Sequence, residues 1–135
     1  MDIAAIQDMF DRIAAPYVRA LGLQVVAASE HQTTLRMPIT PELIHVGGAV
    51  CGQSVLAAAD TAMVVATSVA LGGFKPMHTV QLQTSFLRPM PASTSELRLV
   101  CHVLRKGKTM AFGEIEIFTP DGKLAAHATT TYAFV

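Results

Sequence analysis

Asp60 is the residue in this chain whose type and surroundings most favour chemistry. It lies in an apolar segment, residues 55–71, and the residues one helical turn away are Leu56, Ala57, Met63 and Val64. None of these can pair with a carboxylate. A buried carboxylate without a partner costs on the order of several kcal/mol or becomes protonated. Asp60 therefore either meets a partner from another element or faces a cleft, where it can act as a general base or a nucleophile. A solvated aspartate on an exposed stripe is the alternative, but its turn carries no other polar residue.

The segment that positions Asp60 is predicted to be a buried helix, because it is apolar on nearly every side and ends at Gly72–Gly73. A glycine-bearing loop, residues 47–52, precedes it. Its length is close to the ~20 residues that span a bilayer. However, it contains Asp60, Thr67 and Ser68 and has neither an aromatic belt nor a basic flank. We therefore predict a core helix and no membrane partner.

The flanking elements alternate between strand patterns and turns. An amphipathic N-terminal helix within residues 1–19, capped by Asp2, is expected to end or bend at Pro16. Strands are predicted at 23–28, 33–39, 78–87, 96–104, 110–118 and 124–134. This order predicts an α+β fold in which a curved antiparallel sheet wraps one long helix.

Strand 78–87 follows the chemically interesting helix and alternates strictly. One face is expected to carry Val80, Leu82, Thr84 and Phe86, and the other Thr79, Gln81, Gln83 and Ser85. On this pattern Thr79 points away from the Val80 face.

Composition narrows the class of protein. At 135 residues the chain is expected to form one domain, 1–135, and its mean hydropathy of +0.42 favours self-association. A net charge of zero argues against nucleic acid as a partner. The two cysteines form no disulfide or zinc pattern, so we expect no metal. The N-terminus lacks the features of a signal peptide, which predicts a cytoplasmic protein.

Three stretches carry a family resemblance: GGAVCGQSVLAAADTAM, TVQLQTSFLRPMP and GKTMAFGEIEIFTPDGKLAAHATTTYAFV. Together, over about residues 20–135, they resemble the hotdog-fold acyl-CoA thioesterases of the phenylacetate-degradation (PaaI-like) type. The resemblance implies a hotdog fold and hydrolysis of coenzyme A thioesters, with no cofactor beyond the coenzyme A of the substrate. It also implies a homodimer, or a tetramer built as a dimer of dimers. The active site would lie at the dimer interface, at the N-terminus of the central helix.

The resemblance also implies roles for particular residues. The family's helix carboxylate falls on Asp60, as general base or as nucleophile. The backbone N–H that polarises the thioester carbonyl falls on Gly52, at a helix N-terminus where free N–H groups suit an oxyanion. A hydroxyl that positions water in related enzymes falls on Thr79.

The helix start departs from the family pattern. Relatives carry His-Gly-Gly where this chain has Cys51, Gly52 and Gln53, and an asparagine where it has His45. His45 can replace that asparagine as a hydrogen-bond donor, or it is an ordinary loop histidine. Gln53 either contacts the substrate or starts the helix.

Substrate contacts are expected from two further groups of residues. Gly48 in the loop and Met63 on the helix are expected at the substrate, with Met77 and Met90 as further candidates for the acyl pocket. The coenzyme A phosphates are expected to meet Arg88 and the basic turn residues Arg105, Lys106 and Lys108, unless that turn is simply solvated.

Two other functions stay open. The altered helix start also fits a non-catalytic acyl-CoA-binding domain. A hotdog hydratase is a weaker alternative, because that chemistry needs a histidine close to the aspartate, and none lies within a turn of Asp60. The acyl group is not determined by these patterns.

Overall fold

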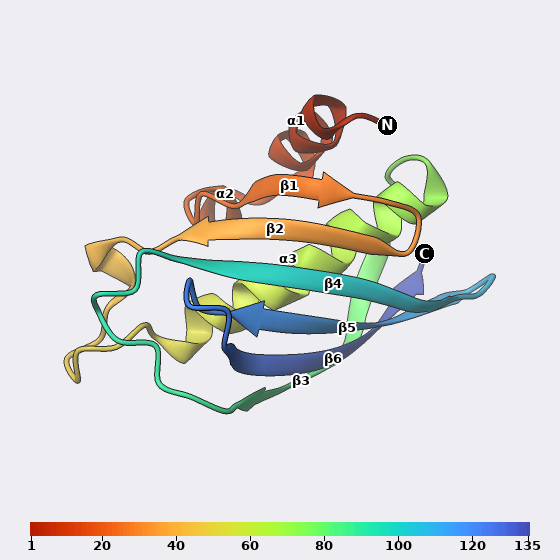
Figure 1. The fold of residues 1–135 in the computed structure, drawn as a ribbon. Coiled ribbons are helices and arrows are strands. Elements are labelled where there is room, and N and C mark those ends of the chain that lie inside the picture. Colours follow the sequence, from red (N-terminus) through yellow and green to blue (C-terminus); the bar gives the residue numbers. More distant parts are fainter.

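The apolar segment forms helix α3 (Gly52–Leu71), which lies against one face of a curved six-stranded antiparallel sheet (Figure 1). The computed structural model describes residues 1–135. The strands are β1 (Gln24–Ala28), β2 (Gln32–Pro38), β3 (Met77–Phe86), β4 (Glu96–Lys106), β5 (Met110–Phe118) and β6 (Leu124–Phe134). They are ordered β1-β2-β4-β5-β6-β3. The predicted α+β architecture, one helix wrapped by an antiparallel sheet, is confirmed.

The helix predicted within residues 1–19 ends before Pro16, as expected, and a second short helix follows it. Helix α1 (Ile3–Ile13) is capped by Asp2, whose carboxylate accepts the Ala5 N–H at 2.7 Å. Helix α2 (Pro16–Arg19) begins at Pro16. Proline disfavours helical backbone at the residue before it, and Ala15 is extended for this reason. The chain therefore bends here, and both helices pack against α3.

Helix α3 is apolar because its sheet-facing side is buried and its remaining sides are covered in part by α1 and α2. Its length and composition would allow it to cross a bilayer, but it is the core helix of this fold. At Gly113 of β5 the side chain of Met63 lies so close to the strand that an added Cβ would clash with the Met63 sulfur. Gly72, with φ of +78°, ends the helix in the left-handed region.

Strand β3 forms one edge of the sheet and is irregular. Its pairing with β6 shifts between Thr79 and Gln81, so Val80 is an extra, bulged residue. The bulge turns Thr79 toward α3, onto the same face as Leu82. The predicted strict alternation, which placed Thr79 on the opposite face from Leu82, was therefore wrong.

A short 3-10 helix, η1 (Pro41–Leu43), leads from β2 into the loop that precedes α3. This loop is tied to the segment after β3. The Val50 N–H donates to Met90 at 2.8 Å, and the Ala92 N–H donates to Gly48 at 2.9 Å. The start of α3 and the end of β3 therefore lie together at one end of the molecule.

Candidate functional site

Asp60 finds its partners on two neighbouring strands. The Thr79 hydroxyl of β3 donates to Asp60 Oδ1 at 2.8 Å, and the Tyr132 hydroxyl of β6 hydrogen-bonds the same oxygen. The Tyr132 hydroxyl also lies 2.9 Å from the Asp60 backbone carbonyl. Thr79 and Tyr132 are directly paired in the β3–β6 ladder. The sheet register thus brings two hydroxyls to one carboxylate oxygen.

This arrangement leaves the two carboxylate oxygens unequal. Oδ1 accepts two hydroxyl hydrogen bonds, whereas Oδ2 has no hydrogen-bond partner within the chain. Burial, and then the hydrogen bond to the Asp60 carboxylate, raise the pKa of Tyr132 well above its ordinary value, so it remains a protonated donor. Oδ1 is therefore the anchored oxygen and Oδ2 the one free to meet water or a substrate.

Asp60 also lines a pocket of about 270 Å³ between the N-terminal helices and α3. Most of the lining is apolar and includes Phe10, Ile13, Val18, Val64, Phe74 and Met77. Both outcomes expected for this carboxylate therefore hold: it has partners from other elements, and it faces a cavity.

The N-terminus of α3 presents free backbone donors. The cap residue Cys51 makes no side-chain capping bond, and no acidic residue lies in the first turn. The Gly52 N–H has no acceptor within the chain. The Gly52 α-carbon faces Phe86 of β3, whose ring would lie 3.4 Å from an added Cβ. Free N–H groups and the positive end of the helix dipole suit a developing negative charge.

His45 is fixed beside this helix start by glycine. The Gly47 N–H donates to His45 Nδ1 at 2.9 Å, so the neutral ring carries its proton on Nε2 and can donate from there. A Cβ at Gly47 would lie 2.7 Å from His45 Cε1, so only glycine permits this contact. Gly48, with φ of +80°, closes the turn. The geometry is compatible with the expected donor role of His45.

Gly52 and Asp60 do not converge within one chain. They are eight residues apart on a straight helix, which separates them by about 12 Å along the axis. A reacting carbonyl needs its oxyanion donor and its attacking group within about 3 Å. In one chain the Gly52 N–H and the Asp60 carboxylate are therefore too far apart to act on the same carbonyl, and we refer to them as two candidate half-sites, the Gly52 half-site and the Asp60 half-site.

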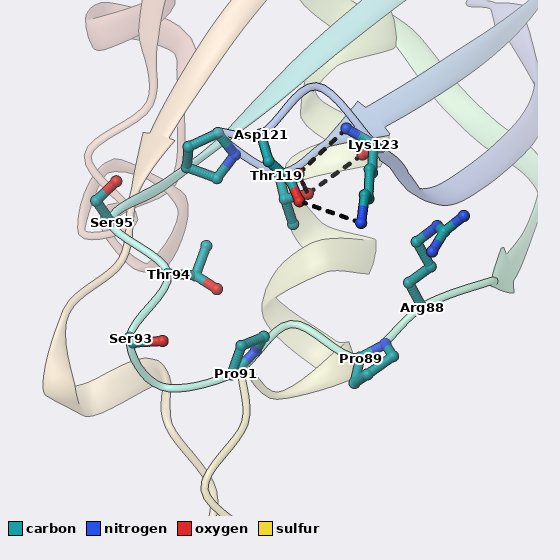
Figure 2. Close-up of a pocket in the computed structure, with 10 residues that line it drawn as sticks. Arg88, Pro89, Pro91, Ser93, Thr94, Ser95, Thr119, Asp121 and Lys123 are labelled. Atoms are coloured by element: carbon teal, nitrogen blue, oxygen red, sulfur yellow. Dashed lines mark hydrogen bonds and ion pairs between the residues drawn. The ribbon is translucent and has the colours of Figure 1, made fainter.

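A second, polar pocket of about 530 Å³ lies near the start of α3 (Figure 2). The segment 88–95 runs along one side of it and the turn 119–123 along the other. Arg88 and Lys123 supply its positive charge, and Ser93, Thr94 and Ser95 supply hydroxyls. Asp121 is the opposing charge, and it is held by the Thr119 hydroxyl and the Lys123 N–H. Lys123 was not predicted as a site residue.

The basic turn does not join Arg88 within the protomer. The Arg88 N–H donates to Ala125 at the start of β6, whereas Thr109 in the basic turn accepts from Phe134 at its far end. The length of β6 separates them by about 30 Å, at opposite ends of the sheet in Figure 1. Lys106 instead donates to the Ala70 carbonyl at 2.9 Å, at the C-terminus of α3. Arg105, Lys106 and Lys108 therefore form no common phosphate site with Arg88 in one chain.

Two of the predicted acyl-pocket methionines are core residues. Met63 is fully buried between α3 and the sheet, with its sulfur 3.9 Å from the Cys101 thiol, and Met90 is also buried. Only Met77 lines the pocket beside Asp60. Gln53 is exposed in the first turn of α3. The expected substrate contact of Met63 is therefore wrong for the protomer.

Tyr132 is the site residue that the sequence patterns missed. It is 2% exposed, and a buried tyrosine hydroxyl needs a partner. The sequence pattern could predict that Tyr132 faces inward near the end of the last strand, but it could not predict that Tyr132 lies beside Asp60.

Comparison with known proteins bears on the family and the fold of the chain. Residues 47–126 match the thioesterase superfamily. A protein of Saccharolobus solfataricus that bears the name "putative esterase" is 29% identical over 126 residues, which cover 93% of this chain and 87% of that protein. A protein of the same name from Thermoplasma acidophilum is 25% identical over 116 residues, covering 86% of each chain.

Solved structures share the fold. A thioesterase of Haemophilus influenzae superposes with a TM-score of 0.85 at 20% identity, covering 96% of this chain and 90% of that one. The E. coli PaaI protein, from the phenylacetic acid degradation operon, superposes with a TM-score of 0.83 at 19% identity, covering 98% and 95%. The hotdog fold is thus confirmed, and the family match extends over more than half of the chain. The chain belongs to the thioesterase superfamily.

Proposed function

We propose that this protein hydrolyses acyl-CoA thioesters to a free acid and coenzyme A, in the cytoplasm, at a site shared by two copies of the chain. The observation that carries the proposal is the Asp60 carboxylate, anchored through Oδ1 and free at Oδ2 beside an apolar pocket. Family membership supports hydrolysis of thioesters or esters in general. The acyl-CoA substrate and the residue roles below are our proposal.

In one route Asp60 acts as a general base. Asp60 Oδ2 removes a proton from water while the water oxygen adds to the thioester carbonyl carbon. The carbonyl oxygen becomes an oxyanion that accepts from the Gly52 N–H and His45 Nε2–H of the partner subunit. The C–S bond then breaks, and the proton passes from Asp60 to the leaving thiolate.

In the other route Asp60 acts as a nucleophile. Oδ2 attacks the same carbon, the thiolate leaves, and the resulting mixed anhydride is hydrolysed by water. Because Oδ2 has no hydrogen-bond partner within the chain, it is available for both routes. Thr79 acts in each by holding Oδ1.

A homodimer is the smallest assembly that can complete this site. Strand β3 is a sheet edge with exposed apolar residues: Val80, Phe86 and Leu87 are 58%, 49% and 55% exposed. Open edges of this kind pair readily with another strand. A two-fold axis beside β3 would set the Gly52 end of one copy against the Asp60 end of the other. We expect a dimer of such dimers as the full assembly.

The coenzyme A moiety would lie along the Gly52 half-site. Phe86 and Leu87 offer an apolar path past the helix start. Beyond them, Arg88 and Lys123 line the polar pocket with serine and threonine hydroxyls. Basic side chains and hydroxyls are suited to phosphate groups.

The test is thiol release from short, medium, long and aryl acyl-CoAs, measured with a chromogenic disulfide. We expect turnover by the natural chain and a loss of about 10³-fold or more in Asp60→Asn, with an unchanged circular dichroism spectrum. Asp8→Asn, at an exposed position of α1 that lines no described pocket, is the matched control and should retain the activity.

Either of two results would decide against hydrolysis by this site. Equal turnover by Asp60→Asn would remove Asp60 from the mechanism. Tight acyl-CoA binding without thiol release over the whole panel would favour the non-catalytic acyl-CoA-binding alternative, with the departures at Cys51 and Gln53 as the cause.

A further inference from the structure

The wall of the pocket beside Asp60 carries few free polar side-chain atoms. The wall contains three polar side chains, Asp60, Thr61 and Tyr132. The Thr61 hydroxyl donates to the Ala57 carbonyl at 2.8 Å, and the Tyr132 hydroxyl is engaged by Asp60. Only Asp60 Oδ2 is left without a partner, and no lysine, arginine or histidine lines the pocket.

We infer that this pocket receives the acyl group and selects an uncharged acyl group without hydroxyl or carboxyl substituents on the part that enters it. The inference rests on the proposed function, since it takes the acyl carbon to lie at Asp60. A polar substituent in the pocket would lose its water and find no partner. A carboxylate would in addition be repelled by Asp60.

Four of the ten residues that line the pocket come from the N-terminal segment: Phe10, Ile13, Ala14 and Val18. Phe10 and Ile13 come from α1 and Val18 from α2, and they face Val64, one turn beyond Asp60 on α3. Phe74, which is 44% exposed, lies between α3 and β3 and completes the lining. The wall formed by α1 and α2 therefore lies outside the segment that matches the family, whereas Val64, Phe74 and Met77 lie inside it.

Binding of non-hydrolysable thioethers of coenzyme A tests this inference without turnover. We would titrate the protein with S-ethyl-, S-hexyl- and S-(5-carboxypentyl)-CoA by calorimetry. Each buried methylene should tighten binding by up to about fourfold. S-hexyl-CoA should therefore bind much more tightly than S-ethyl-CoA, and at least about tenfold more tightly than its carboxylated counterpart.

Val64→Phe should fill the pocket. It should weaken the binding of S-hexyl-CoA by about tenfold or more and change the affinity for S-ethyl-CoA by less than about twofold. The matched control is Val26→Phe, at a 41% exposed position of β1 that lines no described pocket. Ile13→Ala, which enlarges the pocket from α1, should shift the preference toward S-octyl-CoA and keeps the test valid if Val64→Phe does not fold.

The possible outcomes separate this inference from the proposed hydrolysis. Equal affinities for hexyl and carboxypentyl thioethers, or a hexyl-to-ethyl ratio unchanged by both variants, would overturn the inference even in an active thioesterase. The expected binding profile in a protein that releases no thiol would support the pocket and refute only hydrolysis.

Discussion

The two half-sites that we propose for this protomer are built in different ways. The Asp60 half-site depends on side chains, because Thr79 and Tyr132 hold one carboxylate oxygen beside an apolar pocket. The Gly52 half-site depends on backbone, because its donors are the N–H groups of the helix start and its loop is shaped by Gly47 and Gly48. In the first, Tyr132 is buried, Asp60 is half-buried and Thr79 is exposed; in the second, Gly47 and Gly48 are exposed.

The difference determines which substitutions can damage each half-site. A carboxylate is removed by one conservative side-chain replacement. A backbone donor survives most replacements and is lost only when proline removes the N–H or when a Cβ displaces the loop. The two half-sites therefore tolerate sequence change differently, which fits the departures from the family pattern at Cys51 and Gln53.

Gly52→Pro should have the largest effect on the backbone half-site. Proline is tolerated at the first helical position, so α3 should persist while the N–H is lost. We expect kcat to fall by about 10²–10³-fold, the range for loss of one oxyanion donor. Steady-state thiol release measures it. Gly52→Ala, which keeps the N–H next to the Phe86 ring, is the control and should lose far less.

Mixing the Gly52→Pro and Asp60→Asn chains extends this test. If each site takes Asp60 from one copy and Gly52 from the other, a mixed dimer carries one intact site. Activity should then reappear after the two inactive proteins are unfolded and refolded together. Continued inactivity, with mixed dimers demonstrated by mass spectrometry, would place both residues of a site in one chain.

Tyr132→Phe tests what the Tyr132 hydroxyl contributes to the Asp60 half-site. Loss of the hydroxyl leaves Asp60 Oδ1 with one donor instead of two, so the free energy of unfolding should fall by about 1–3 kcal/mol. The carboxylate also becomes less restrained, and we expect kcat to drop by about tenfold with a smaller change in KM. Denaturant unfolding and steady-state kinetics measure the two effects. Thr79→Val is the comparison, with a smaller loss of stability because Thr79 is exposed.

The protonation state of Tyr132 can be checked directly. In a Tyr17→Phe protein Tyr132 is the only tyrosine. Because burial and Asp60 raise its pKa, no tyrosinate absorbance should form near pH 10, about the ordinary value for tyrosine. Titration at that pH in the folded protein would show that the hydroxyl does not bind Asp60.

Removal of the positive charges of the polar pocket should have a more moderate effect. Arg88→Ala and Lys123→Ala should each raise KM for acyl-CoA by about three- to tenfold and leave kcat nearly unchanged, because they would contact only the phosphates. The effect should weaken at high salt. Lys108→Ala, in the turn at the far end of the sheet, should change KM little. A larger effect from Lys108 would restore the basic turn as the phosphate site.

Lys106→Ala should have the smallest effect. Lys106 donates to the Ala70 carbonyl at the C-terminus of α3, where a cation favours the helix dipole. Its loss should reduce the free energy of unfolding by roughly 0.3–1 kcal/mol and leave the kinetics unchanged. A change in KM without a change in stability would contradict this structural role.

The elements themselves were largely predictable from local patterns. The strands β5 and β6 begin and end where the sequence predicts, because Pro120, Asp121 and Gly122 form a turn between alternating residues. Helix α3 and its end at Gly72 follow from an apolar segment and one glycine. Such signals act over a few residues and do not depend on the remainder of the fold.

Asp60 was predictable as a site residue for a similar reason. Its own helix offers no partner, so burial alone required one from elsewhere. The need for a partner was predictable from the sequence, but the identity of that partner, Tyr132 on the last strand, was not. It also could not place the basic turn. Arg88 follows β3 and Lys106 ends β4, the next strand in the chain, yet the two residues lie at opposite ends of the sheet.

The sequence by itself determined the fold class, the central helix and the isolated carboxylate, because helix and strand periods and turn chemistry are local. The tertiary structure decided which groups meet that carboxylate. A single bulged residue at Val80 turned Thr79 toward α3, and the pairing of β3 with β6 set Tyr132 beside it. One residue of shift in a strand moves every later side chain to the other face, and that shift is set by pairing between strands distant in the chain.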